Sequence, residues 1–448
     1  MKTLYMVSLG CPKNLVDSEV MLAVLEQAGY SVVEQPEEAS LLLVNTCGFI
    51  RPAVEEAIDE ILGLAAYKEE YPDKILVVTG CMVQRYGSEL ISEMPEVDLF
   101  IGLDDFRYID RLLHDISSSN RIVTNPGPAV YVMDSSVPRR VSTPFFRSYL
   151  KITEGCDNHC AYCMIPSIRG RLRSRTMEDL IVEAKRLEES GVRELSLIAQ
   201  DLTAYGNELD RQVNLVRLLG GLLENTAIPW LRLLYLYPSS VTDSLLQLMA
   251  EQPRILPYLD IPFQHVSDRV LHAMNRHYNQ SVLDDLVQRI RLYVPGCAIR
   301  TTMLVGFPGE TEADVALLVE ALKRWQLDHV GVFQYQDEEG SKAAGFPGKI
   351  SDEEKEARYQ WVMETQAEIS ERLQQRFVGK VEQVLIEGVS RESDLLLEGR
   401  SRYQAPDIDG CVYITSGQVH PGDIVPVRIT EAHTYDLVGE AVNEQENL

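Results

Sequence analysis

The first 120 residues alternate between short apolar runs and amphipathic segments. Apolar runs typical of buried strands occupy residues 3–9, 41–44, 75–78 and 97–101. Amphipathic patterns between them predict helices over residues 15–28, from 52 to about 67, and from about 83. Because strands that alternate with helices form parallel sheets with right-handed crossovers, we expect an N-terminal α/β domain with a doubly wound parallel sheet over residues 1–120.

The alternation stops at residues 121–141, where Pro126, Pro128 and Pro138 indicate a linker. It returns over residues 142–374. Strand candidates at 149–153, 194–199, 230–235, 258–261, 298–305 and 329–333, with helices between them such as 177–189 and 312–325, predict a partial (β/α)6 barrel. A long charged helical pattern begins at 352. Residues 376–442 then carry short alternating strands punctuated by glycine, which predicts a small antiparallel, OB-like β-barrel.

Composition excludes several classes of protein. Hydrophobic residues make up 45% of the 448 residues, enough for real cores, and no uncharged apolar run approaches the ~18 residues that span a bilayer. The start of the chain does not resemble a secretion signal, so we expect a cytoplasmic protein that does not bind membranes. The net charge of −26 repels nucleic-acid backbones, argues against DNA as a partner and suits a basic one, although it is also common in ordinary soluble enzymes.

Eight cysteines in a reducing compartment point to metal chemistry rather than disulfides. Cys156, Cys160 and Cys163 have the spacing C-x-x-x-C-x-x-C just after the first predicted barrel strand. Three thiolates on one loop can each hold one iron of a four-iron cluster and leave the fourth iron open. The alternative is a zinc site with His159 as the fourth ligand, but no second Cys pair follows.

A second set of cysteines is dispersed in the sequence. Cys11, Cys47 and Cys81 each follow a predicted strand of the N-terminal sheet, and the carboxyl ends of parallel strands lie on one edge. We therefore expect these three thiols to meet and to form another three-cysteine site, rather than to be three unrelated buried thiols. Cys297 and Cys411 stand alone and are interpreted as packed or incidental thiols.

The spacing of the clustered cysteines, with Tyr162 just before the third, resembles the radical S-adenosylmethionine (SAM) superfamily. This resemblance implies that the open iron binds the amino and carboxylate groups of SAM, and that an electron splits SAM to give a 5′-deoxyadenosyl radical. Cys156, Cys160 and Cys163 would then be catalytic, and Tyr162 would flank the adenine. A core aromatic is the alternative for Tyr162.

Both three-cysteine sets, the barrel and the small β domain together resemble the methylthiotransferases over nearly the whole chain. The resemblance implies an N-terminal methylthiotransferase domain, a radical SAM domain and a TRAM domain. Residues 7–19 (VSLGCPKNLVDSE) and 45–50 (NTCGFI) resemble the RimO type, which modifies an aspartate of the twelfth protein of the small ribosomal subunit. The similar MiaB type, which modifies adenosine of tRNA, usually has Gln after its first cysteine and Ala-Val-Arg after its second, and this chain has neither.

The charge of the C-terminal β domain gives an independent test of the RimO-type resemblance. Residues 376–440 hold six basic and eleven acidic residues, whereas a domain that grips tRNA should present a positive face. An acidic domain is better matched to a basic ribosomal protein.

The resemblance implies two 4Fe-4S clusters, two molecules of SAM per turnover, sulfide as the sulfur co-substrate and an electron-donor protein. Sulfide at the Cys11/Cys47/Cys81 site would be methylated first, and the radical would then remove hydrogen from the aspartate β-carbon. Other enzymatic and non-enzymatic interpretations remain open. They are the same chemistry on tRNA adenosine, radical SAM methylation with structural N-terminal cysteines, and a non-enzymatic iron–sulfur carrier or ribosome-binding adaptor.

Several other residues are candidates for binding roles. Arg169, Arg171 and Arg173 lie just beyond the cysteine loop and could bind the substrate aspartate or the SAM carboxylate, or simply form a solvated turn. Gln200 and Asp201 follow a strand and are candidates for binding SAM, with a helix cap as the alternative for this pair. Gly306 and Gly309 predict a tight turn near adenosine. His265 lies at the same barrel edge but is better explained as a structural histidine.

Overall fold

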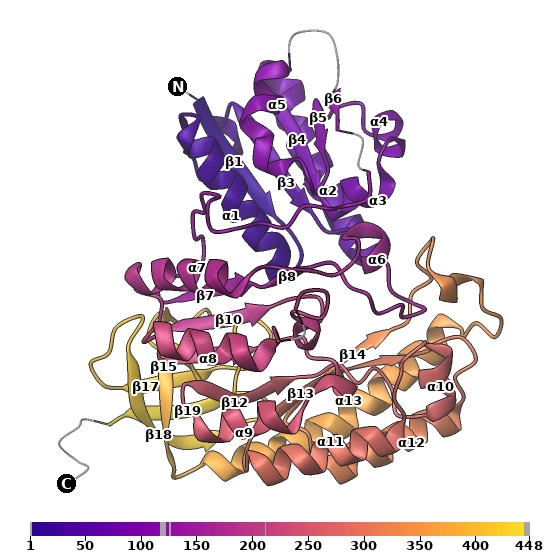
Figure 1. Ribbon diagram of the computed structural model, residues 1–448, viewed down its shortest axis with the longest axis vertical. Coiled ribbons are helices and arrows are strands. Elements are labelled where there is room, and N and C mark those ends of the chain that lie inside the picture. The colour runs from indigo at the N-terminus through magenta and orange to yellow at the C-terminus, as the bar shows by residue number, and fades with distance from the viewer. Residues whose placement is uncertain (1, 117–121, 125–126, 211, 443–448) are drawn as a thin grey trace.

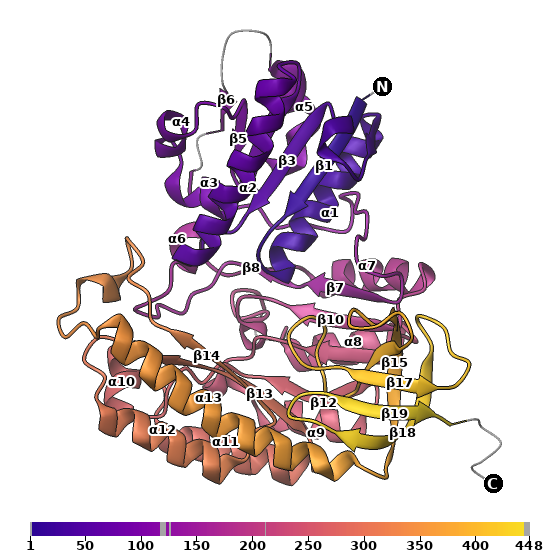
Figure 2. The same cartoon turned by 180° about the vertical axis from the view of Figure 1, so that it is seen from behind.

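A computed structural model describes the chain except for residues 1, 117–121, 125–126, 211 and 443–448 (Figure 1). The N-terminal part lies above a central sheet of strands, and the C-terminal barrel lies against one end of that sheet (Figures 1 and 2). Among the described helices, none combines the length and the apolar character needed to cross a bilayer.

The N-terminal sheet is six-stranded and parallel, with order β2-β1-β3-β4-β5-β6. Its strands are β1 (Lys2–Ser8), β2 (Tyr30–Val32), β3 (Leu41–Thr46), β4 (Ile75–Gly80), β5 (Leu99–Ile101) and β6 (Ile122–Val123). Its helices are α1 (Pro12–Gln27), α2 (Arg51–Glu70), α3 (Cys81–Tyr86), α4 (Glu89–Glu93) and α5 (Ile109–Asp115). All six residues of β3 are buried, as in strands covered by helices on both faces.

Three local features differ from the sequence prediction. Helix α1 begins at Pro12 rather than at residue 15, because proline is favoured in the first turn, and Cys11 becomes its N-cap. Helix α3 begins at Cys81 rather than at about residue 83, and it ends before Gly87, whose φ is +51°. Strands β2 and β6 were not predicted, and β6 extends the sheet into the segment predicted as linker. Part of that linker, residues 121 and 125–126, falls outside the described residues.

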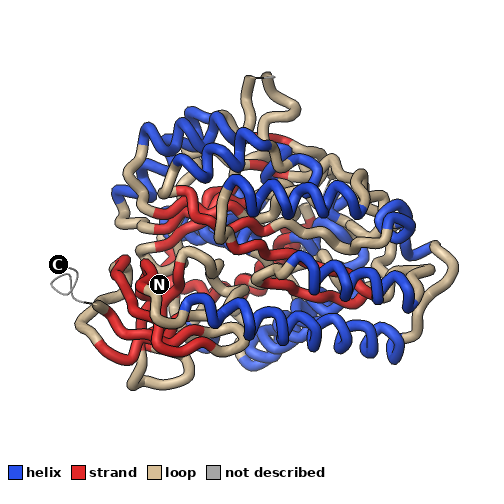
Figure 3. The backbone as a smooth tube through the Cα atoms, turned by 90° about the horizontal axis from the view of Figure 1, so that it is seen from below, coloured by secondary structure: helices blue, strands red, loops and turns tan. Residues whose placement is uncertain are grey.

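The central sheet has six parallel strands in the order β14-β13-β12-β11-β10-β7 and forms the predicted partial barrel, open between β7 and β14. Its strands are β7 (Arg147–Lys151), β10 (Glu194–Ile198), β11 (Trp230–Leu233), β12 (Ile255–Asp260), β13 (Ala298–Val305) and β14 (His329–Gln334). Its helices are α6 (Ile165–Ile168), α7 (Met177–Glu189), α8 (Leu215–Asn225), α9 (Asp243–Glu251), α10 (Asp268–Ala273), α11 (Gln280–Tyr293), α12 (Glu312–Trp325) and α13 (Asp352–Gln374). Seen from below, long helices line the outside and strands lie between them (Figure 3).

A small antiparallel pair, β8 (Thr153–Glu154) and β9 (Arg173–Ser174), brackets the clustered cysteines. Because the two strands pair, the loop between them starts and ends at one place. The remaining short elements are the 3-10 helices η1 (Pro36–Glu38), η2 (Phe106–Tyr108), η3 (Leu202–Ala204), η4 (Pro238–Ser240), η5 (Lys342–Gly345) and η6 (Gln375–Phe377).

The C-terminal strands close into a five-stranded barrel in the order β15-β16-β17-β19-β18. They are β15 (Val381–Val389), β16 (Leu397–Ser401), β17 (Val412–Ser416), β18 (Ile424–Ala432) and β19 (Leu437–Ala441). Its core includes the fully buried Val384, Ile386, Val427 and Ile429. The prediction of a small C-terminal β-barrel is therefore confirmed, but the barrel is not antiparallel throughout, because β17 and β19 pair in parallel.

Ion pairs join this barrel to the amino ends of the central strands, and those of Glu194 are buried. Arg400 donates to Glu194, the first residue of β10, and Glu194 also accepts from Arg232 of β11. Asp407 accepts from Arg147 of β7. The small barrel thus lies at the end of the central sheet opposite to the carboxyl ends where β/α enzymes place their sites.

Candidate active site between two sets of cysteines

The three dispersed cysteines follow strands that are neighbours in the N-terminal sheet. Cys11 lies in the loop after β1, and Cys47 and Cys81 directly follow β3 and β4. The loops pack closely, since a Cβ on Gly10 would lie 2.9 Å from Cys47 Cβ, and one on Gly48 would lie 2.7 Å from the Cys81 carbonyl oxygen. The fold therefore brings together the three thiols that the sequence predicted to meet.

These thiols lie in one electrostatic environment. Burial raises the pKa of Cys81 to about 12 and also raises the pKa of Cys47. At Cys11 burial acts in the same direction, but the cations of Lys13 and Arg169, together with the backbone N–H groups of Asn14 and Lys13, outweigh it and the pKa is lowered. Cys11 is therefore the thiol of this set that deprotonates most readily.

The clustered cysteines lie on the loop between β8 and β9. Cys156 N–H donates to the Gly170 carbonyl at 3.1 Å, which closes the loop. The three sulfurs accept hydrogen bonds of 3.4 Å from three donors: the amide of Asn158 to Cys156, the guanidinium of Arg276 to Cys160, and the amide of Ile165 to Cys163. Burial raises the pKa of Cys156 to about 11 and that of Cys163 to about 12, so these thiols are neutral until a metal displaces their protons.

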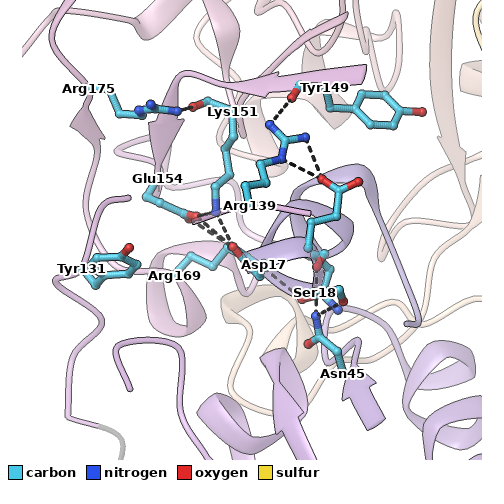
Figure 4. Close-up of polar contacts among 12 residues, drawn as sticks. Asp17, Ser18, Asn45, Tyr131, Arg139, Tyr149, Lys151, Glu154, Arg169 and Arg175 are labelled. Atoms are coloured by element: carbon cyan, nitrogen blue, oxygen red, sulfur yellow. Dashed lines mark hydrogen bonds and ion pairs between the residues drawn. The ribbon is translucent and has the colours of Figure 1, made fainter. Parts of the chain in front are cut away.

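Four buried charged side chains lie between the two cysteine sets, and Figure 4 shows the contacts that these four side chains make with one another. Asp17 comes from α1, Lys151 from β7, Glu154 from β8, and Arg169 follows α6. Arg169 donates to Glu154 at 3.0 Å and to Asp17 at 3.0 Å, and Lys151 donates to the same two carboxylates. None of the four is more than 6% exposed. The network pairs two anions with two cations.

The network touches both sets of cysteines directly. Glu154 lies two residues before Cys156, and the guanidinium of Arg169 hydrogen-bonds the Cys81 thiol and lowers its pKa against the effect of burial. Although burial alone would raise it, Lys151 and Arg169 lower the pKa of Glu154 to about 2, so this carboxylate stays ionised. Arg169 also donates to Asn14 Oδ1 at 3.2 Å. One arginine therefore links the loops that carry the two sets.

Two further contacts hold the N-terminal domain on the barrel. Arg139 donates to Glu19 of α1 and to Glu183 of α7. On the other side, Arg85 of α3 donates to Glu338 at 2.9 Å, in the segment after β14. The two thiol sets therefore lie within a junction that is fastened at several points.

The chemistry of three thiols in each set suits a four-iron cluster. No three His, Cys, Asp or Glu side chains among the described residues stand close enough together to hold one metal ion. In a four-iron cluster each cysteine binds a different iron, so its ligands lie farther apart than those of one ion. Three thiols with N–H donors aimed at each sulfur fit such a cluster, and His159 is exposed rather than turned into a zinc site.

Comparison with known proteins finds a match for each of the three parts of the fold, namely the N-terminal sheet, the central partial barrel and the C-terminal barrel. The pattern described as uncharacterized protein family UPF0004 matches residues 3–102, the radical SAM superfamily matches 150–322, and the TRAM domain matches 378–442. Proteins named ribosomal protein uS12 methylthiotransferase RimO are similar over almost their whole length. The one from Desulfotalea psychrophila is 54% identical, with 98% of this chain and 99% of that protein covered. The one from Myxococcus xanthus is 48% identical, with 98% and 92% covered.

The chain belongs to the RimO family of methylthiotransferases.

Solved structures show the fold that the RimO-family chain shares with other radical SAM enzymes. The radical SAM methyltransferase TsrM from Kitasatospora setae, with tryptophan and a SAM analogue bound, has a TM-score of 0.55 at 16% identity, covering 74% of this chain and 73% of that one. The cobalamin-dependent radical SAM enzyme OxsB has a TM-score of 0.51 at 12% identity, covering 83% and 56%. Membership of the radical SAM superfamily implies a 4Fe-4S cluster and SAM for this RimO-family enzyme.

The structure places Gln200 and Asp201 beside the second set of cysteines. Asp201 accepts from Asn158 at 2.7 Å and also caps η3 through the amides of Thr203 and Ala204, so the predicted cap is present. Gln200 donates weakly to Glu154 at 3.4 Å, and its Oε1 is buried without a partner among the described residues. That oxygen is free to accept from a ligand, and SAM binding by this pair remains a prediction.

Tyr162 and the glycine turn have structural explanations of their own. Tyr162 packs against an apolar cluster that contains Met274 and Phe307. Gly306 has a φ of +76°, and a Cβ there would lie 2.4 Å from Lys355 Cγ of α13. Gly309 donates to the Gly348 carbonyl at 2.8 Å. Contact of these residues with adenosine remains a prediction.

The predicted substrate-binding arginines occupy three different environments. Arg169 is 2% exposed and fully engaged in the network, which favours a positioning role over direct contact with substrate. The Arg171 side chain is 88% exposed and pairs with Asp157 at 3.3 Å. Arg173 is half-buried and donates to backbone carbonyls, including that of Arg169. Substrate binding by the three remains a prediction.

His265 is a buried structural histidine in this RimO-family fold, because its Nδ1 accepts from the amides of Val266 and Ser267. Several residues of the site were not predicted. Lys13 and Asp17 lie within the motif of residues 7–19. The sequence signal that could have identified them is that they are charged residues in a segment predicted to form a strand and a helix. Arg276 lies 116 residues from Cys160, and no local pattern links the two.

Proposed function

We propose that this enzyme inserts a methylthio group at the β-carbon of an aspartate of ribosomal protein uS12, using two 4Fe-4S clusters, SAM and sulfide. Relatives with that name share 46–54% identity with the chain. The observation that carries the proposal is the placement of two three-thiol sets on either side of one buried network, Asp17, Lys151, Glu154 and Arg169. A reaction that joins a sulfur group to a carbon radical needs both centres at one junction.

In the proposal, Cys156, Cys160 and Cys163 hold the cluster that supplies the electron for SAM cleavage, and Cys11, Cys47 and Cys81 hold the cluster that carries the sulfur. Asn158, Ile165 and Arg276 direct N–H groups at the first three sulfurs and stabilise their thiolate form. Gln200 and Asp201 lie where a SAM molecule would meet the loop. A substrate bound at this junction would shield a radical from water.

The charges of the C-terminal barrel favour a protein substrate. Of its six basic residues, Arg400, Arg376 and Arg402 are engaged with the central domain, through Glu194, Asp328 and the Pro253 carbonyl. Lys380, Arg391 and Arg428 are exposed, against the exposed acids Glu392, Asp394, Glu431 and Glu440. A surface of this composition attracts a basic ribosomal protein more than a tRNA backbone.

We also propose that the enzyme has three functional units, with the boundaries 1–120, 142–374 and 376–442. So does an electron-donor protein, which would deliver electrons to the second set of cysteines.

Mass spectrometry after one anaerobic incubation tests the proposal. The reconstituted enzyme receives SAM, sulfide, a reductant, uS12 and tRNA together. We expect a methylthio group on an aspartyl peptide and formation of 5′-deoxyadenosine. A methylthio group on a tRNA nucleoside would refute the substrate assignment, methylation without sulfur would indicate that the N-terminal cysteines are structural, and absence of 5′-deoxyadenosine would support a carrier or adaptor.

A further inference from the structure

Lys13 is a buried lysine that is paired with no carboxylate. Its side chain lies on α1, the residue is 8% exposed, and its ammonium lies 3.4 Å from the centroid of the Tyr235 ring. Within the described chain, no residue accepts a hydrogen bond from its ammonium group or forms an ion pair with it. Two other buried lysines are satisfied: Lys74 donates to three carbonyls, and Lys151 donates to Asp17 and Glu154.

The carboxylates near Lys13 are already matched with other cations. Asp17 and Glu154 are paired with Lys151 and Arg169, and Asp260 accepts from Arg300 at 2.9 Å. Burying a charge without a partner costs several kcal/mol by general estimates, so a protein rarely keeps one without a use. Lys13 is thus left without a carboxylate of its own at the junction, and the neighbouring anion that most favours its charged form is the Cys11 thiolate.

The surroundings of Lys13 are those of a binding position. It follows Cys11 by two residues, and Tyr235 lies just beyond β11, at the carboxyl ends of the barrel strands. The φ of Tyr235 is +65°, an unfavourable value for a residue with a side chain, and its N–H donates to Asp260 at 3.2 Å. Such strain persists where the surroundings impose it, most often at functional sites. Lys13 therefore lies between Cys11 of the first cysteine set and the carboxyl ends of the barrel strands.

We propose that the Lys13 ammonium binds the side-chain carboxylate of the target aspartate. The inference rests on the proposed function and deepens it, because it names the group that selects aspartate. A charge-assisted hydrogen bond to this carboxylate supplies the missing anion and fixes the neighbouring β-carbon beside the first cysteine set. Asparagine at the same position would leave Lys13 unpaired and bind more weakly.

Binding of peptides to the oxidised holoenzyme tests the inference without turnover. Fluorescence anisotropy under anaerobic conditions with SAM measures Kd for uS12 peptides that carry Asp, Asn or Glu at the target position. We expect the wild type to prefer Asp over Asn by about tenfold or more, the difference expected for a hydrogen bond between charged groups. Lys13→Met should abolish this preference, and Lys13→Arg should retain part of it.

Lys2→Met is the matched control, because Lys2 also stands over a tyrosine ring, that of Tyr30 at 5.0 Å, but is exposed at the opposite end of β1. It should keep the wild-type preference. Iron content and the Kd for SAM are measured for every variant.

Three outcomes for Lys13→Met would overturn the inference: an unchanged Asp preference, a loss of SAM affinity with no change for the peptide, or a loss of iron from the N-terminal set. The first means that Lys13 does not select the substrate, the second that it binds the SAM carboxylate, and the third that it serves as counter-ion to the thiolates. If the wild type modifies tRNA and not the aspartyl peptide, the proposed function fails as well. If it modifies the peptide while the variant keeps the preference, only this inference fails.

Discussion

Arg169 and Glu154 are bound at two points, with Arg169 Nη1 3.1 Å and 3.0 Å from the two carboxylate oxygens of Glu154. Glu154 precedes the second cysteine loop, and the other end of the same guanidinium reaches Asp17, on the helix that follows Cys11. The pair therefore helps to fix the two cysteine sets relative to each other.

Arg169→Met should destabilise the junction strongly. The substitution leaves Asp17 and Glu154 with one buried cation between them, and breaking a buried ion pair typically costs about 3–5 kcal/mol. We expect a lower midpoint of thermal unfolding for the cluster-free protein and less iron bound after reconstitution. Differential scanning calorimetry and iron analysis measure the two effects.

Arg171→Met serves as the stability control, since its side chain is 88% exposed and its pair with Asp157 should contribute about 0–1 kcal/mol. Equal unfolding midpoints for the two variants would show that the network does not hold the junction together.

Glu194 makes attachment of the C-terminal barrel sensitive to acid. Burial opposes ionisation, but Arg232 and Arg400 lower the pKa of Glu194 from 4.5 to about 2. A carboxyl group with a lowered folded-state pKa contributes stability that is complete above pH 4.5 and lost as the pH falls toward 2. A shift of this size corresponds to about 3 kcal/mol. Wild-type stability should therefore fall across this range.

Glu194→Gln should be less stable than the wild type at pH 7 and should lose stability less steeply below pH 4.5. Thermal unfolding between pH 7 and pH 3 measures both effects. Glu392→Gln, at an exposed position in the same barrel, should follow the wild-type curve. An acid profile of Glu194→Gln as steep as that of the wild type would contradict the assignment.

The cysteine sites could be predicted because the residues of each site either lie close together in the sequence or are brought together by the topology of the sheet. Cys156, Cys160 and Cys163 share one loop, and Cys11, Cys47 and Cys81 are brought together by a rule that holds for every parallel sheet. Strand β2 could not be recognised because its three residues are partly exposed and lack the buried apolar run that marks the equally short β5, and β6 has only two residues. The buried charge network could not be predicted from the sequence either, because Asp17 and Arg169 are 152 residues apart and meet only when the N-terminal domain packs on the barrel.

Gly155 should tolerate no side chain. Its φ is +73°, and a Cβ would lie 2.1 Å from the Arg171 carbonyl oxygen, where the two ends of the cysteine loop meet. Gly155→Ala should therefore displace Cys156 and reduce the iron bound by the second set. Absorbance and iron content after reconstitution measure the loss.

Gly63→Ala is the matched control, and we expect it to raise stability rather than to disturb the structure. Gly63 lies within α2, and no neighbouring atom of the described chain comes within 4 Å of the position that a Cβ would take there. Alanine should therefore stabilise the helix by about 0.5–1 kcal/mol and leave iron content unchanged. Normal iron content in Gly155→Ala would mean that the loop closes differently.

Cys47→Ala separates the roles of the two sets of cysteines. Cys47 lies in the N-terminal set, outside the loop of Cys156, Cys160 and Cys163, so its removal should lower iron content and abolish methylthiolation while SAM cleavage to 5′-deoxyadenosine continues. Liquid chromatography of the nucleoside and mass spectrometry of the peptide measure the two products in one reaction. Cys411→Ala, in the C-terminal barrel, should retain both activities and all of the iron. Methylthiolation by Cys47→Ala at the wild-type level would show that the sulfur does not pass through the N-terminal set.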